Sequence, residues 1–115
     1  MKMLRLHVGL IPVGLSGMLW GAALLSFAYA GAPTTQQVTI DQFKFTPAAL
    51  TVPVGTTVTW TNKDDTVHTV TSNTKAFGSE ALDQGGTFSY TFAAPGTYAY
   101  FCKLHPRMTG TVTAQ

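Results

Sequence analysis

Short stretches that alternate between apolar and polar residues recur from residue 37 to the end of the chain. A period of two is typical of β-strands that bury one face. We expect strands at Gln37–Asp41, Leu50–Val54, Thr56–Asn62, Thr66–Ser72, Thr87–Phe92, Thr97–Phe101 and Gly110–Thr113. No long amphipathic helical pattern appears after residue 30. The pattern therefore predicts an all-β sandwich of about seven to eight short strands.

Single residues refine this picture. Phe43 and Phe45 are expected on one face of a short strand that stops at Pro47. Pro53 has no N–H to donate, which places its strand at an edge or a bulge. Residues 73–84 show weak periodicity and predict a loop with one helical turn, in which Phe77 points into the core.

The N-terminal residues have a different character. Lys2 and Arg5 precede an almost wholly apolar run, Val8–Tyr29, and small residues follow in the pattern Ala28-Tyr29-Ala30. A basic start, an apolar core and an A-x-A site are typical of a secretory signal peptide. We interpret residues 1–30 as a cleaved signal peptide. Cleavage after Ala32, or retention as a membrane anchor, remains the alternative.

Three segments follow from this division: a signal peptide at residues 1–30, a flexible lead-in at residues 31–36 and one domain at residues 37–115. Without the leader, five basic residues face five acidic ones. This balance gives no indication of nucleic-acid binding. We expect a periplasmic protein, monomeric and without stable membrane insertion once the leader is cleaved.

Candidate ligands for a metal are concentrated near the C-terminus. Cys102, His105 and Met108 follow the spacing Cys-x2-His-x2-Met, and Cys102 is the only cysteine. A lone cysteine in an exported chain cannot form an internal disulfide. His68 is the only other histidine outside the leader. Cys, two His and a weak Met are the ligands of a blue-copper electron-transfer site, in which the axial thioether tunes the potential.

The segment from Gly96 to Met108 resembles the C-terminal ligand loop of cupredoxins, the small type 1 blue copper proteins. Its two residues between His105 and Met108 make the loop as short as in amicyanins, within the amicyanin and plastocyanin type. The resemblance implies a Greek-key β-sandwich that binds one copper ion through His68, Cys102, His105 and Met108. Many cupredoxins have Asn after the first ligand histidine, whereas this chain has Thr69. Asn62 and Asn73 are therefore candidates for bracing the site.

The resemblance also implies a function. We expect a one-electron carrier that cycles between Cu(II) and Cu(I) and is not an enzyme. Electrons would pass through His105, with redox-protein partners docking around it. The alternative is a periplasmic copper chaperone or storage protein, which usually exposes several Met or His donors. Met108 is the only methionine outside the leader, and this disfavours the alternative.

Overall fold

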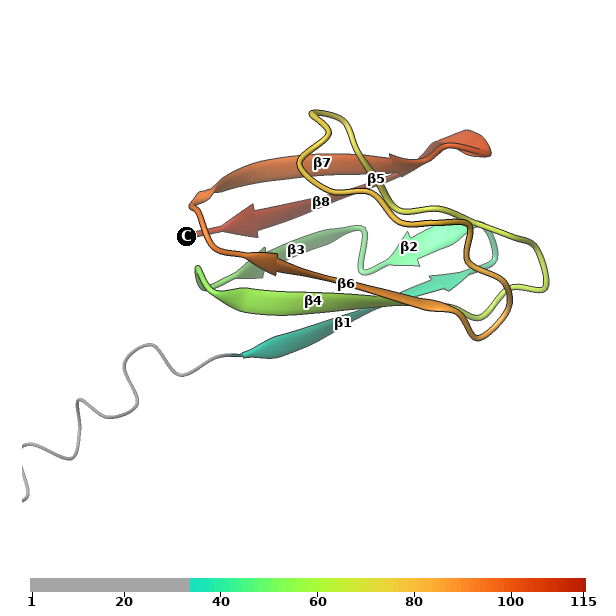
Figure 1. Cartoon of the computed structure of the whole chain (residues 1–115), viewed down its shortest axis with the longest axis horizontal. Helices are drawn as coiled ribbons and strands as arrows, with labels where there is room; N and C mark the ends of the chain where they lie inside the picture. Colours follow the sequence, from blue (N-terminus) through green and yellow to red (C-terminus); the bar gives the residue numbers. More distant parts are fainter. Residues whose placement is uncertain (1–33) are drawn as a thin grey trace, which may run out of the picture. The chain divides into compact units, whose positions relative to one another are not determined.

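The computed structural model of the protein describes residues 34–115, which form two four-stranded β-sheets packed face to face (Figure 1). The strands are β1 (Thr35–Asp41), β2 (Lys44–Thr46), β3 (Ala49–Val52), β4 (Thr56–Asn62), β5 (Thr71–Ser72), β6 (Thr87–Phe92), β7 (Gly96–Cys102) and β8 (His105–Ala114). The predicted β-sandwich is confirmed. The expected signal peptide and residues 31–33 of the lead-in lie outside the described residues, and the end of the lead-in, Thr35 and Gln36, already belongs to β1. Within residues 34–115, no helix is long and apolar enough to cross a membrane.

Each sheet combines one parallel pair with antiparallel neighbours. The first sheet has the order β2-β1-β4-β6, and β1 runs parallel to β4 with Val38 opposite Trp60. The second has the order β3-β8-β7-β5, and β3 runs parallel to β8. β3 is therefore an edge strand, one of the two placements predicted from Pro53, and it ends at Val52, before the proline.

Aromatic side chains fill the space between the sheets. Trp60 is fully buried in β4, where buried and half-buried positions alternate strictly. Its ring centroid lies 5.4 Å from that of Tyr100, at an interplanar angle near perpendicular, 83°. Phe77 and Phe92 complete the centre of this cluster. Such edge-to-face packing gives a well-defined core because each ring fixes its neighbours.

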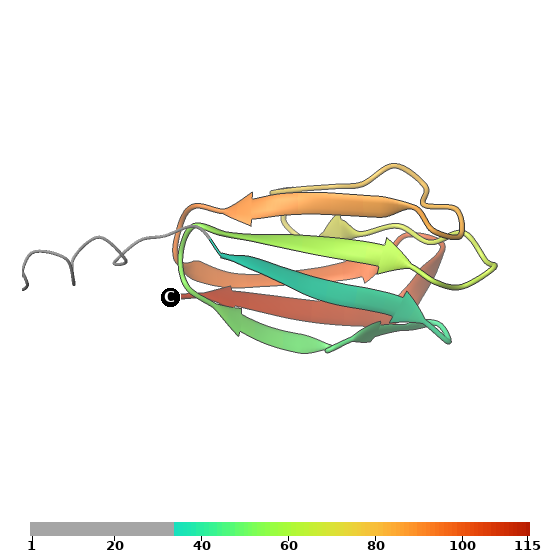
Figure 2. The same cartoon turned by 90° about the horizontal axis from the view of Figure 1, so that it is seen from below.

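Three connections meet at one end of the sandwich, opposite the C-terminus (Figures 1 and 2). They are the β1–β2 turn, the segment that follows β4, and the β7–β8 turn. The strands thus bring together residues that are far apart in the sequence. The histidine and cysteine residues singled out above lie on two of these connections.

The predicted strand at Thr66–Ser72 is wrong except for its last two residues, which form β5. β-Branched residues favour a strand here, but side-chain hydrogen bonds bend the chain instead. The Asn62 side-chain amide donates to the carbonyl of Thr66, at 2.9 Å. His68 then forms an isolated bridge with Leu82. Local propensity is overruled by these tertiary contacts.

Two further expectations need correction. Residues 73–84 contain no helical turn: residues 73–76 form a tight turn that the pairing of Thr71 with Gly78 closes, although Phe77 does enter the core. Phe43 and Phe45 do not share a face. Phe45 is buried, whereas Phe43 occupies a tight turn with φ +58° and leaves 49% of its surface exposed.

Candidate metal centre

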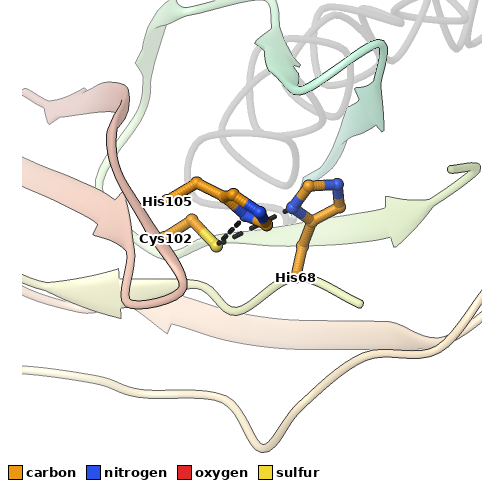
Figure 3. Close-up of side chains that lie close together, drawn as sticks. All are labelled: His68, Cys102 and His105. Atoms are coloured by element: carbon orange, nitrogen blue, oxygen red, sulfur yellow. Dashed lines mark hydrogen bonds between the residues drawn. The ribbon is translucent and has the colours of Figure 1, made fainter. Parts of the chain in front are cut away.

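Three of the four predicted ligands converge at this end of the sandwich. His68 comes from the segment between β4 and β5, Cys102 ends β7 and His105 begins β8. Their potential donor atoms all lie within 4.8 Å of one another. Figure 3 shows the two imidazole rings next to each other, with dashed lines that join the Cys102 sulfur to a nitrogen of each ring. His68 and Cys102 are fully buried, and His105 is half-buried.

The separations match the requirements of a single metal ion. The sulfur of Cys102 lies 3.7 Å from Nδ1 of His68 and 3.5 Å from Nδ1 of His105. With a metal–nitrogen bond of about 2.0 Å and a metal–sulfur bond of about 2.3 Å at an angle of about 120°, the nitrogen and the sulfur lie about 3.7 Å apart. The Cys102 thiolate and two neutral imidazoles therefore fit a trigonal His2Cys site for one copper ion.

The ligand loop is a β-hairpin with a two-residue turn, Lys103-Leu104. Cys102 pairs directly with His105, but the preceding residue, Phe101, pairs with Thr109. Residues 106–108 are therefore extra residues on β8, and they form a bulge beside the two ligands. Bulges of this kind redirect side chains near functional sites.

Met108 is the last residue of this bulge, and it is 94% buried, with 6% of its surface exposed. It belongs to the same buried cluster as Cys102. Its role as the fourth, axial ligand remains a prediction from its spacing.

Asp64 holds His68 from the side opposite the cysteine. Its carboxylate Oδ2 lies 2.8 Å from Nε2 of His68. An Nε2–H that donates to the carboxylate leaves the Nδ1 lone pair free to bind a metal. The backbone N–H of Phe43, helped by His68 and the N–H of Gln42, holds the pKa of Asp64 below its usual 3.8, although desolvation opposes this shift. Asp64 is therefore a carboxylate at neutral pH and can orient the ring.

Asp64 is fixed in turn by Asn62. The side-chain oxygen of Asn62 accepts the N–H of Asp64 at 2.9 Å, and its amide donates to the carbonyls of Thr66 and Leu82. Asn62 is fully buried, so these bonds are shielded from water. The loop that carries His68 thus has its own buried hydrogen-bonded support.

Thr69 connects the two ligand-bearing segments. Its backbone N–H donates to the sulfur of Cys102 at 3.3 Å, and its hydroxyl accepts the N–H of Lys103 at 2.8 Å. The substitution of the usual asparagine therefore does not remove the brace, because the shorter hydroxyl reaches the turn. Asn73 contacts β7 instead, through its backbone N–H to Ala99. An N–H donated to a thiolate also stabilises its negative charge.

Sequence reasoning missed two residues of the site, Asp64 and Phe43. The Phe43 ring stands edge-on to both ligand histidines, with centroids 5.1 Å from His68 and 5.0 Å from His105. Its left-handed backbone is held by the N–H groups of Gln42 and Phe43, which both donate to the Asp64 carboxylate. Asp64 carries one sequence signal, its position four residues before His68. Phe43 carries none.

A β-sandwich that places one thiolate and two imidazoles at the spacing of a trigonal copper site defines a class of mononuclear copper protein. The family model of the "Cupredoxin-like domain" matches residues 14–114. The chain belongs to the cupredoxin-like family.

Relatives within this family include small copper proteins. Amicyanin-alpha of Methylorubrum extorquens is 32% identical over the full length of both chains. Amicyanin of Paracoccus denitrificans is 36% identical over 83 residues, covering 68% of this chain and 63% of its own length. Among solved structures, a purple cupredoxin from Nitrosopumilus maritimus is 34% identical with a TM-score of 0.66. That match covers 70% of this chain and 99% of the other. The fold and family expected from the ligand loop are therefore confirmed.

Proposed function

We propose that this protein is a one-electron carrier whose copper ion is bound by His68, Cys102, His105 and Met108. The observation that carries this proposal is the arrangement of one thiolate and two imidazoles at the separations that a single trigonal ion requires. Bound copper would supply the Cu(II)/Cu(I) couple. Met108 would be the weak axial donor, because its bulge follows His105 directly.

The protein's own contribution to electron transfer is rigidity. Asp64 fixes the ring of His68, and Thr69 fixes both the sulfur of Cys102 and the turn that follows it. Each of these hydrogen bonds comes from a residue that does not bind the metal. A ligand set held in this way changes little when the charge of the site changes, and this favours fast electron transfer.

Burial argues against a role in copper exchange. A chaperone or store must release its metal to a partner, but His68 and Cys102 have no exposed surface. A four-ligand site also leaves no open position at which a substrate would bind, in contrast to catalytic metal sites. We therefore favour an electron carrier over a copper-handling protein or an enzyme.

Partners would approach at His105. Two exposed apolar side chains lie beside this half-buried histidine. Phe43, 49% exposed, contacts its ring, and Leu104, 54% exposed, precedes it in the sequence. Apolar residues around a redox centre fit short-lived docking of a redox protein, since such encounters use small interfaces. We place the protein in the periplasm, after removal of residues 1–30. The N-terminal residue of the exported protein tests this location.

The test of function is a visible spectrum of the purified protein after addition of Cu(II). We expect an intense thiolate-to-copper band that ascorbate bleaches reversibly, and Cys102→Ser should lack it. Met108→Leu should keep the band but change the reduction potential, because it removes only the weak axial donor. A folded parent protein without the band would refute the proposal. An unchanged potential in Met108→Leu would remove Met108 from the ligand set.

A further inference from the structure

A hollow of about 410 Å³ opens beside the metal centre, on the side of β5. Buried Phe77 and half-buried Phe101 give it an apolar wall, and Phe101 directly precedes Cys102. Thr71 and Asn73 add polar groups. The volume lies within the range of small-molecule sites, which combine apolar walls with a few polar groups.

The hollow is positively charged. Lys75 and Lys103 both line it, and no acidic residue does. They are two of only five lysine and arginine residues between positions 34 and 115, which also contain five acidic residues. This part of the chain is formally neutral, so the paired lysines create a local field that favours an anion.

Both lysines are attached to ordered turns. Lys75 has a left-handed backbone, with φ +63°, and its N–H donates to the carbonyl of Ser72 at 3.2 Å. Lys103 donates its N–H to the Thr69 hydroxyl at 2.8 Å. The main chain at both lysines is therefore already held, so binding of an anion would need to order only their side chains.

A short chain of hydrogen bonds links the hollow to the thiolate. The hydroxyl of Thr71 lies 3.1 Å from that of Thr69, and the N–H of Thr69 donates to the sulfur of Cys102 at 3.3 Å. If Thr71 donates its proton to an anion, its oxygen must accept the proton of Thr69, because each hydroxyl has only one. Occupancy of the hollow would thus fix the direction of the hydrogen bond at Thr69, the residue whose main-chain N–H contacts the sulfur of Cys102.

We propose that this hollow is a binding site for a small organic anion, a carboxylate on an apolar or aromatic body, and that its occupancy is coupled to the metal centre. The coupling rests on the function proposed above, whereas the binding does not. A bound negative charge favours the more positive, oxidised site, so it should lower the reduction potential. By reciprocity the oxidised protein binds the anion more tightly than the reduced protein.

Binding is tested first on metal-free protein, with benzoate as the probe and amide chemical shifts as the readout. We expect saturable shifts at Asn73, Lys75 and Lys103. Benzyl alcohol, which lacks the charge, should bind at least fivefold more weakly. Lys75→Gln should weaken benzoate binding to the same degree, whereas Lys63→Gln, an exposed lysine outside the hollow, should not. Shifts that do not saturate, or that sodium chloride reproduces at equal ionic strength, would overturn the binding site.

Coupling is tested on copper-loaded protein by measuring the reduction potential with and without benzoate. A tenfold preference for the oxidised form lowers the potential at saturation by about 59 mV for one electron. Thr71→Val removes the hydroxyl and keeps the shape, so it should reduce this response while binding persists. Saturable binding with an unchanged potential would refute the coupling alone. Failure of the copper function would instead appear as a missing absorption band, with the amide shifts unaffected.

Discussion

Removing the hydroxyl of Thr69 is the most direct test of how the two ligand-bearing segments are held together. Thr69→Val keeps the shape of the side chain and removes only the oxygen that accepts the N–H of Lys103 and contacts the hydroxyl of Thr71. The N–H of Thr69 belongs to the main chain, so its bond to the sulfur of Cys102 should survive. The substitution therefore separates the brace between the segments from the contact with the thiolate.

The expected loss of stability follows from these two bonds. A typical intramolecular hydrogen bond contributes about 0.5 to 1.5 kcal/mol, and a buried donor left without a partner costs about 1 to 3 kcal/mol. Lys103 is exposed, so water can partly replace the lost oxygen, whereas Thr69 itself is 94% buried, with 6% exposed. We expect a loss of about 1 to 2 kcal/mol. For a domain of this size each kcal/mol lowers the melting temperature by about 4 to 8 °C.

Urea unfolding of the metal-free protein measures this change, and amide hydrogen exchange at Lys103 locates it. Thr69→Asn should recover part of the stability, because its side-chain oxygen can accept the same N–H. Thr69→Ser keeps the hydroxyl and should leave the Lys103 amide protected, even though it loses a methyl group. If the free energy of unfolding of Thr69→Val lies within about 0.5 kcal/mol of the parent value, and the Lys103 amide stays equally protected, the hydroxyl does not brace the two segments.

Substitutions at four other positions test different parts of the structure. Gly110→Ala would make a Cβ clash with the ring and hydroxyl of Tyr100, so we expect the free energy of unfolding in urea to fall by about 1 to 3 kcal/mol. Tyr100→Phe should cost little, because that buried hydroxyl has no hydrogen-bond partner among the described residues. The lowered pKa of Asp64 contributes stability above its usual value of 3.8 that is lost as the pH falls through the folded-state pKa. Asp64→Asn should therefore be less stable than the parent at neutral pH and equally stable in strong acid, as measured by unfolding across pH. Phe43→Ala should speed removal of copper by a chelator, followed by loss of the visible band, whereas Phe43→Leu should lie between this variant and the parent.

The sequence predicted those features that depend on nearby residues. The alternation at Thr56–Asn62 specifies a strand with Val58 and Trp60 buried, and β4 has this pattern. The spacing of Cys102 and His105 could be recognised because a two-residue turn brings them together regardless of the rest of the fold. A site built from one hairpin leaves a local signal of this kind.

Contacts between distant segments left no such signal. Asp64 meets the turn at Gln42 and Phe43 across more than twenty residues, and only the fold brings them together. The failed strand at residues 66–70 has the same origin. Its β-branched residues favour an extended ladder, but the buried side chain of Asn62 turns the chain toward Leu82. Single-sequence patterns report propensity, and here burial of a polar side chain with all its partners overrides it.

The three ligands are not held equally, and this asymmetry has a consequence for the site. His68 has a carboxylate behind its ring, and Cys102 has an N–H donated to its sulfur. His105 is half-buried, and apart from the ligands themselves, the neighbour seen at its ring is the exposed side chain of Phe43. Any change in coordination should therefore begin at His105, which is also the ligand that a partner would reach first. His68 and Cys102, which have hydrogen-bonded support, face the core, whereas His105 faces solvent. Docking of a partner at Phe43 and Leu104 would therefore support the ligand that has the fewest contacts of its own.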